Sequence, residues 1–192
     1  MKTSSRSLTI TQLLSSIKES ELFWIISFSI LTAISAQVSI PIKPVPFTLQ
    51  TMVVLLAGAL LGAKNGAYSQ VLYIFLGAIG LPVFAQTADG TIGLARLISP
   101  TGGYLLAFPI AAYLVGYLTS KNQKYTFVVI SMIVAELVVI FTGTLYLYAA
   151  YLHNLVDAIK AGAAIFTVWM AVKVFAAATI YIAVSKKQPK LP

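Results

Sequence analysis

Residues 125–150 read YTFVVISMIVAELVVIFTGTLYLYAA, and this stretch decides the class of the protein. Glu136 is its one charged side chain, and the other residues are apolar, aromatic, small or hydroxyl-bearing. A helix that crosses a bilayer needs roughly 20 mostly apolar residues, which this run supplies. The run also lacks the alternation of apolar and polar residues that marks a transmembrane strand. We therefore predict a membrane-spanning helix over Tyr125–Ala150.

The same apolar character extends over the whole chain. Hydrophobic residues make up 59% of the 192 residues and charged residues 9%, with a mean hydropathy of +0.91. Because a soluble domain of this length does not bury so much apolar surface, lipid is the expected solvent. We predict an all-α membrane protein with six transmembrane helices in one bundle. The predicted spans are Leu22–Ile40, Phe47–Gly62, Gly66–Leu81, Gly102–Thr119, Tyr125–Ala150 and Ala163–Val184.

The bundle is predicted to form a single integral membrane domain over residues 1–192. Residues 1–21 are a polar segment ahead of bundle residues 22–184, and residues 185–192 form a short tail. Most of the 13 Lys and Arg residues fall in these end segments or in the links on the same side, and cytoplasmic segments retain positive charge. We expect a multi-pass protein of the plasma membrane with both termini cytoplasmic. The net charge of +8 then reflects contacts with anionic lipid head groups rather than nucleic-acid binding.

Several chemistries have no support in the sequence. The chain contains no cysteine and one histidine, which excludes disulfides and a His/Cys metal site. The phosphate-binding pattern G-x-x-x-x-G-K-[ST] does not occur, so ATP hydrolysis by that route is excluded. No nucleophile–base pair or metal cluster presents itself, and we expect neither enzyme activity nor a cofactor.

The link between the first two spans contains three prolines, Pro41, Pro44 and Pro46. Because proline fixes its own backbone and restricts the residue before it, the link is stiff and continues neither helix. It forms either a rigid cover over a ligand or a plain turn. Thr48, Gln50 and Thr51 follow it at the top of the next span, where their polar groups either face a ligand or cap the helix.

The link over residues 80–104 is too long for a simple connection, and long ordered loops are usually functional. Arg96 lies in it among apolar neighbours, so its guanidinium must find an anion or a carbonyl. The planar fork of an arginine suits a ligand carboxylate, since it makes two parallel hydrogen bonds. Contact with a lipid phosphate is the alternative.

Lys173 lies within the sixth span, roughly ten residues from either end and thus near the bilayer midplane. An ionised lysine at that depth costs several kcal/mol unless it is paired or solvated in a cavity. It therefore belongs to a ligand site or pairs with Glu136 in span five, and such a pair can also line a pocket. Trp169 and Met170 share its helical face and offer a wall for a ligand ring, unless they serve ordinary helix packing.

Three stretches resemble signature motifs of BioY, the biotin-binding S component of energy-coupling factor (ECF) transporters. They are residues 44–51 (PVPFTLQT), 77–85 (GAIGLPVFA) and 100–106 (PTGGYLL), in the family's order. The similarity extends from about Phe23 to Val184. It implies the six-helix S-component fold and high-affinity capture of biotin near the outer face. It further implies a transmembrane coupling protein (T component) and two ATPase subunits as partners for import.

The resemblance also assigns roles to residues. Arg96 matches the family's arginine before the PTGGY stretch, and Lys173 matches the lysine of its final Asp-x-x-Lys pattern. Met170 stands where that pattern has aspartate, so the acceptor for the ureido N–H groups of biotin is missing there. Gln50, Gln86 and Asp89 are candidate replacements, and a different vitamin or small carboxylate is the alternative ligand.

The complete set of candidate residues follows from the motifs and the unusual polar groups. The predicted substrate-binding residues are Arg96, Lys173, Met170, Trp169, Thr48, Gln50, Phe84, Gln86 and Tyr104. The family docks its coupling protein on small residues of the first helix, which Ser29, Ala33 and Ala36 supply here, with intramolecular packing as the alternative. An integral membrane enzyme or a structural membrane protein is the remaining alternative to an S component.

Overall fold

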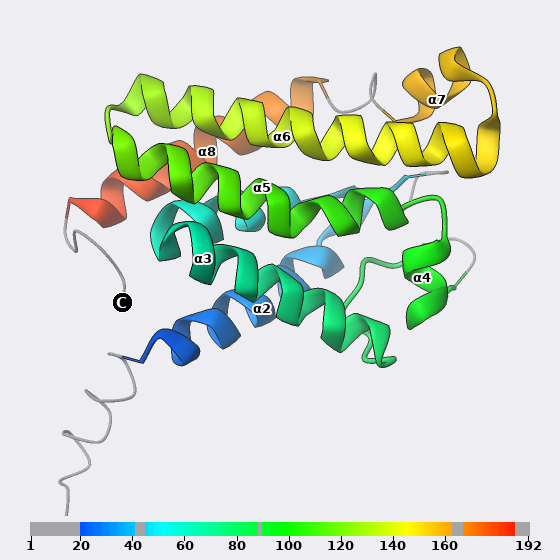
Figure 1. Cartoon of the computed structure of the whole chain (residues 1–192), viewed down its shortest axis with the longest axis horizontal. Helices are drawn as coiled ribbons and strands as arrows, with labels where there is room; N and C mark the ends of the chain where they lie inside the picture. Colours follow the sequence, from blue (N-terminus) through cyan, green and yellow to red (C-terminus); the bar gives the residue numbers. More distant parts are fainter. Residues whose placement is uncertain (1–19, 41–44, 88–89, 163–166, 187–192) are drawn as a thin grey trace, which may run out of the picture.

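Helices account for most of the chain in the computed structural model, which describes residues 20–40, 45–87, 90–162 and 167–186. The predicted long apolar runs form its long helices, while the links contain short elements (Figure 1). In chain order the elements are α2 (Glu21–Gln37), β1 (Ser39–Ile40), β2 (Phe47–Thr48), α3 (Gln50–Ala78), α4 (Leu94–Ile98), α5 (Gly102–Lys121), α6 (Tyr125–Leu147), the π-helical turn η1 (Tyr148–Leu152), α7 (Leu155–Gly162) and α8 (Thr167–Ser185).

Helix α3 contains the second and third predicted spans. It is broken at Gly62, whose φ of 78° lies where side chains other than glycine are strained. The chain reverses there, and its two halves pack so closely that a Cβ on Gly66 would lie 2.7 Å from the Cα of Gly58. Lys64, predicted in a link, is therefore helical. With α2, α5, α6 and α8, the two halves of α3 complete the six-helix bundle predicted from the sequence.

The surface and the interior of the bundle differ in the way expected for a lipid environment. Large apolar side chains point outward, among them Phe75, Phe141 and Phe175, and Phe141 is 69% exposed. Small residues such as Ala107 and Ala111 are fully buried between the helices, which lets the backbones approach closely. By length and composition, α3, α5 and residues 125–152 are apolar enough to cross a membrane, and α2 and residues 169–185 are shorter apolar helices.

The two ends of the bundle carry different elements (Figure 1). At one end lie the start of α2, the reversal within α3, the link between α5 and α6, and the end of α8. The other end carries β1, β2, α4, η1 and α7. The described chain thus enters and leaves the bundle at the same end, and both of the long links singled out in the sequence gather at the opposite end.

Two boundaries differ from the prediction. The first span ends at Gln37 because Ser39–Ile40 pairs in antiparallel fashion with Phe47–Thr48, Ser39 opposite Thr48; Pro41 and Pro44 lie outside the described residues. Helix α8 is described from Thr167, after a separate helix α7 that ends at Gly162. Lys173 lies on the second turn of α8 as described, and residues 163–166 of the predicted sixth span lie outside the described residues.

Candidate ligand-binding site

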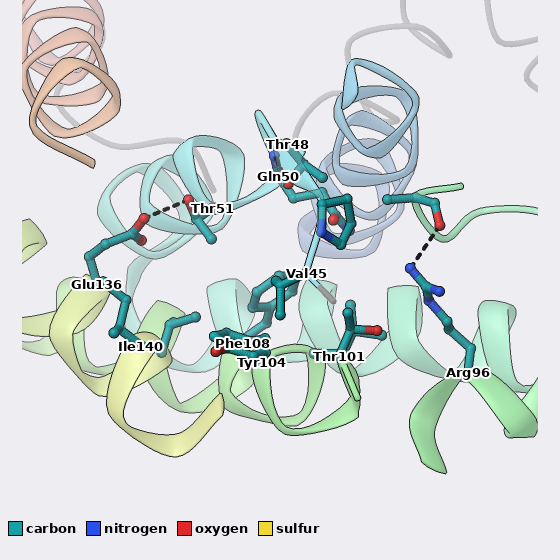
Figure 2. A pocket seen from close by; sticks show the side chains of 14 residues that line it. Val45, Thr48, Gln50, Thr51, Arg96, Thr101, Tyr104, Phe108, Glu136 and Ile140 are labelled. Carbon is teal, nitrogen blue, oxygen red and sulfur yellow. Dashed lines mark hydrogen bonds between the residues drawn. The ribbon is translucent and has the colours of Figure 1, made fainter. Parts of the chain in front are cut away.

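A small cavity lies at the end of the bundle that carries β1, β2 and α4 (Figure 2). Its free volume is about 40 Å³. This is room for a few water molecules and far less than the roughly 300 Å³ of a common ligand pocket. A ligand of vitamin size must therefore displace part of the wall. The lining residues are Val45, Pro46, Thr48, Gln50, Thr51, Ala85, Arg96, Thr101, Tyr104, Leu105, Phe108, Glu136, Val139 and Ile140.

Arg96 reaches the cavity from α4 and is only 2% exposed. Its guanidinium donates hydrogen bonds to the carbonyl oxygen of Ala85 at 3.0 Å, to Thr87 Oγ1 and to Thr91 Oγ1 at 3.5 Å. The long link therefore folds back over the arginine and holds it in the cavity wall. Because the side chain is buried inside the protein, the alternative of contact with a lipid phosphate does not fit.

Contacts from α6, η1 and the start of α5 hold α4 in position. Tyr146 on α6 donates a hydrogen bond to the carbonyl oxygen of Ile98 at 3.1 Å, and Tyr151 on η1 donates to the same oxygen. At the start of α5, a Cβ on Gly102 would lie 1.8 Å from the carbonyl oxygen of Leu97, so only glycine allows this approach. These contacts anchor the short helix that carries Arg96.

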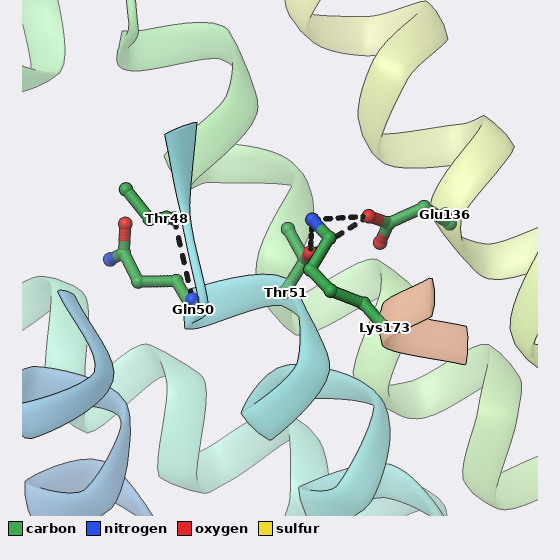
Figure 3. Close-up of polar contacts among 5 residues, drawn as sticks. All are labelled: Thr48, Gln50, Thr51, Glu136 and Lys173. Carbon is green, nitrogen blue, oxygen red and sulfur yellow. Dashed lines mark hydrogen bonds and ion pairs between the residues drawn. The ribbon is translucent and has the colours of Figure 1, made fainter. Parts of the chain in front are cut away.

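Lys173 and Glu136 form a buried ion pair between α8 and α6 (Figure 3). Lys173 Nζ lies 3.0 Å from Glu136 Oε1, and Thr51 Oγ1 donates to the same oxygen at 2.7 Å. Lys173 also donates to Thr51 Oγ1, so the three residues form a closed triangle. Lys173 is 2% and Glu136 1% exposed. The ion-pair alternative from the sequence is therefore confirmed, with Glu136 and Thr51 facing the cavity and Lys173 behind them.

Gln50 and Tyr73 connect the cavity to the long link. Gln50 Nε2 donates to the hydroxyl of Tyr73 at 2.5 Å, and that hydroxyl donates to the carbonyl oxygen of Val83 at 3.3 Å. The ring of Tyr73 packs edge-on against Phe84, with centroids 5.4 Å apart. Thr48 Oγ1 accepts a hydrogen bond from the backbone N–H of Gln50 at 3.3 Å, and Thr48 also lines the cavity.

The comparisons with known proteins agree with this architecture. The model of the BioY family matches residues 5–190, nearly the whole chain.

The chain belongs to the BioY family.

Relatives in that family share substantial identity with the chain. The biotin transporter BioY of Thermotoga maritima is 36% identical over 159 residues, covering 83% of this chain and 92% of the relative. The probable biotin transporter BioY of Lysinibacillus sphaericus is 40% identical over 131 residues, covering 67% of this chain and 65% of the relative. The crystal structure of the S-component for biotin from an ECF-type ABC transporter superposes with a TM-score of 0.80 at 26% identity, over 96% of this chain and 97% of that chain. The chain therefore has the fold of a BioY S component.

Four of the predicted BioY site residues line the cavity: Thr48, Gln50, Arg96 and Tyr104. The hydroxyl of Tyr104 lies 3.3 Å from Thr144 Oγ1 and donates to the carbonyl oxygen of Gly162 at 3.1 Å. Phe84 and Gln86 instead line a neighbouring cavity of about 280 Å³. The other residues that line it are Gln37, Leu81, Pro82, Ala85, Thr87, Gly90, Thr91 and Ile92. Ala85 borders both cavities, so the long link separates them. Asp89 lies outside the described residues.

Trp169 and Met170 do not form the predicted wall of the cavity. Trp169 is 37% exposed, and Met170 is half-buried against the hydrophobic core. Neither lines the cavity, and Lys173 contacts its lining residues Glu136 and Thr51 without lining it itself. The prediction relied on a shared helical face, which does not specify how far the face lies from the ligand.

The small residues of α2 are oriented differently from the docking prediction. Ser29 and Ala36 are buried in the bundle and Ala33 is half-buried. The outward side of α2 carries large residues instead, including Ile30 and Ile34. In this conformation the intramolecular packing alternative fits, because small side chains let α2 approach α3 closely.

Sequence reasoning missed several lining residues. Val45 and Pro46 belong to the proline-rich link, and their burial in the cavity wall fits a cover better than a plain turn. Val139 and Ile140 lie three and four residues after Glu136, so the helical period starting from that carboxylate would have found them. Thr51 was noted with Thr48 and Gln50 as a polar group at the top of its span, but its contacts with Glu136 and Lys173 were not predicted. Thr101 lies inside a recognised motif and was not chosen as a candidate.

Proposed function

We propose that this chain is the substrate-binding subunit of an ECF-type importer, which captures biotin with high affinity and moves it across the plasma membrane. The observation that carries the proposal is Arg96, a buried guanidinium in the wall of a cavity on a BioY fold. Biotin ends in a carboxylate, and the fork of an arginine makes two parallel charge-assisted hydrogen bonds to such a group. The biotin-transporting relatives support the same ligand.

The rest of the cavity suits the body of the ligand. Tyr104, Phe108 and Ile140 provide apolar surface for the fused rings and the alkyl chain. The cavity enlarges when the segment at Val45 and the link at Ala85 move outward, since both form its wall. Closure then removes the ligand from water, which strengthens its interaction with Arg96.

Transport involves no covalent chemistry in this proposal. The subunit reorients in the membrane when a T component and two ATPase subunits hydrolyse ATP, and the chain itself acts as no enzyme. Both termini are cytoplasmic, as the distribution of Lys and Arg predicts. The start of α2 and the end of α8, at one end of the bundle, are compatible with that topology.

Calorimetric titration of detergent-purified protein with biotin tests the proposal. We expect binding of about one biotin per chain, and Arg96→Lys, which keeps the charge but not the planar fork, retains part of the affinity. Absence of binding up to millimolar biotin would contradict the proposal.

A second ligand class is favoured by one position. Met170 stands where the resemblance places an aspartate, so an S component for a different vitamin or small carboxylate remains an alternative. Titration with a small panel of vitamins distinguishes biotin from the alternative ligands. We expect only the ligand that the site recognises to bind at micromolar concentration. Turnover of a vitamin precursor by the purified chain would instead indicate a membrane enzyme.

A further inference from the structure

One oxygen of the buried carboxylate of Glu136 is not used by the fold. Oε1 receives the hydrogen bond of Thr51 and lies 3.0 Å from Lys173 Nζ. Oε2 is buried and has no hydrogen-bond partner among the residues that the structure describes. Buried polar atoms are normally satisfied, and an unsatisfied one points to a ligand or another missing donor.

Glu136 lies in the wall of the cavity. The residue borders the cavity from α6, while its contacts with Thr51 and Lys173 hold Oε1 at the wall. Figure 2 shows Glu136 and Arg96 on opposite sides of the pocket, with Val45, Tyr104 and Phe108 between them. The cavity therefore has a guanidinium on one side, a carboxylate oxygen on the other, and apolar surface in the middle.

We infer that Glu136 Oε2 accepts a hydrogen bond from an N–H donor of the ligand and thereby fixes its orientation. The inference rests on the proposed function and specifies its site. Biotin fits this arrangement because a cyclic urea with two N–H groups lies at one end and its carboxylate at the other. The ureido ring then points to Glu136 and the carboxylate to Arg96. Glu136 on α6 supplies the acceptor that Met170 does not supply on α8.

Thr51 and Lys173 act as positioning residues in this site. They occupy Oε1, which leaves Oε2 available for the hydrogen bond that we infer. Glu136→Gln is informative for this reason. Lys173 and Thr51 attract the amide oxygen of the glutamine, so its NH2 group turns toward the cavity and opposes the ureido N–H groups.

The test compares two ligands and three proteins by titration in detergent. Biotin and biotin methyl ester differ only at the end assigned to Arg96. In Glu136→Gln we expect both ligands to bind about tenfold or more weakly, with their ratio unchanged, since a hydrogen bond to a charged group contributes at least this much. In Arg96→Ala we expect the preference for biotin over its methyl ester to disappear.

A second variant keeps the inference testable if Glu136→Gln does not fold. Glu136→Asp retains the negative charge beside Lys173 but withdraws the carboxylate by one methylene, and it too should weaken both ligands equally. Affinity for biotin like that of the wild type in a folded Glu136 variant overturns the inference and leaves the proposed function intact. If the wild-type chain binds no biotin, the proposed function fails first, and the two results are distinguishable.

Discussion

Arg96 and Lys173 are both buried cations near one cavity, and the structure holds them in different ways. Lys173 lies on a long helix and its charge is met by the carboxylate of Glu136 on another long helix. Arg96 lies on a five-residue helix, and hydrogen bonds to Ala85, Thr87 and Thr91 hold it inside the link that covers the cavity. The first arrangement ties helices together, whereas the second places a cation in the segment that, in the proposed function, moves to admit the ligand. The role of a buried charge in a membrane protein is therefore inferred from the groups that it contacts, and not from its depth in the bilayer alone.

Removing the cation of the helix pair should produce the largest effect, and on folding. Lys173→Met leaves the buried carboxylate of Glu136 without a counter-ion, which costs about 3–5 kcal/mol. We expect a marked fall in the thermal midpoint of the detergent-purified protein. A midpoint like that of the wild type would show that the pair is not structural and would remove the contrast with Arg96.

Removing the cation of the link should chiefly affect binding. Arg96→Ala loses a buried, hydrogen-bonded charge contact to the ligand, and such losses cost about 2–5 kcal/mol in binding free energy. Biotin stabilises the native state of the wild type by mass action, so the expected readout is loss of the biotin-induced rise in thermal midpoint. A fall in the ligand-free midpoint as large as that of Lys173→Met would contradict the distinction drawn between the two cations.

The hydroxyl between the charges of the helix pair gives a smaller effect. Thr51→Val keeps the shape but removes the group that donates to Glu136 and accepts from Lys173. Leaving buried polar groups unsatisfied costs about 1–3 kcal/mol, which should lower both the thermal midpoint and the affinity for biotin. Thr119→Val, which removes a buried hydroxyl that donates to backbone carbonyls within α5 and does not line the cavity, is the matched control and should leave biotin affinity nearly unchanged.

The smallest effect is expected where the resemblance places an acidic residue. Met170→Asp introduces a carboxylate on α8, but Met170 packs against the core and does not border the cavity. We expect biotin affinity to change by less than about threefold, because the new carboxylate does not line the cavity and adds no group to the ligand site. A gain of tenfold in calorimetric titration would move the acceptor from Glu136 to position 170.

The sequence predicted the helices well because the signal for a membrane span is local. The starts of the fourth and fifth spans, Gly102 and Tyr125, coincide with the starts of α5 and α6. Gly62 was predicted as the end of the second span and is the residue at which α3 reverses. A glycine or proline after an apolar run marks such an end without any tertiary information.

The candidate site was predictable only in part. Arg96 was found because an arginine among apolar residues is conspicuous, and its hydrogen bonds to residues 85–91 depend on how the long link folds. Trp169 and Met170 were chosen from the helical face of Lys173, yet a face leaves open which neighbour it meets and at what distance. No sequence pattern indicated that Glu136 Oε2 has no hydrogen-bond partner among the described residues, since this depends on the contacts that α3 and α8 make with Oε1.

The sequence by itself determined that this chain is a bundle of apolar helices of the BioY family, because hydropathy, helix ends and motifs are written in contiguous residues. Only the tertiary structure decided which polar groups meet. Thr51, Glu136 and Lys173 come from three different helices. Thr51 is 85 residues from Glu136 and 122 residues from Lys173 in the sequence. Their assembly depends on helix rotation and packing in three dimensions, which no local pattern specifies.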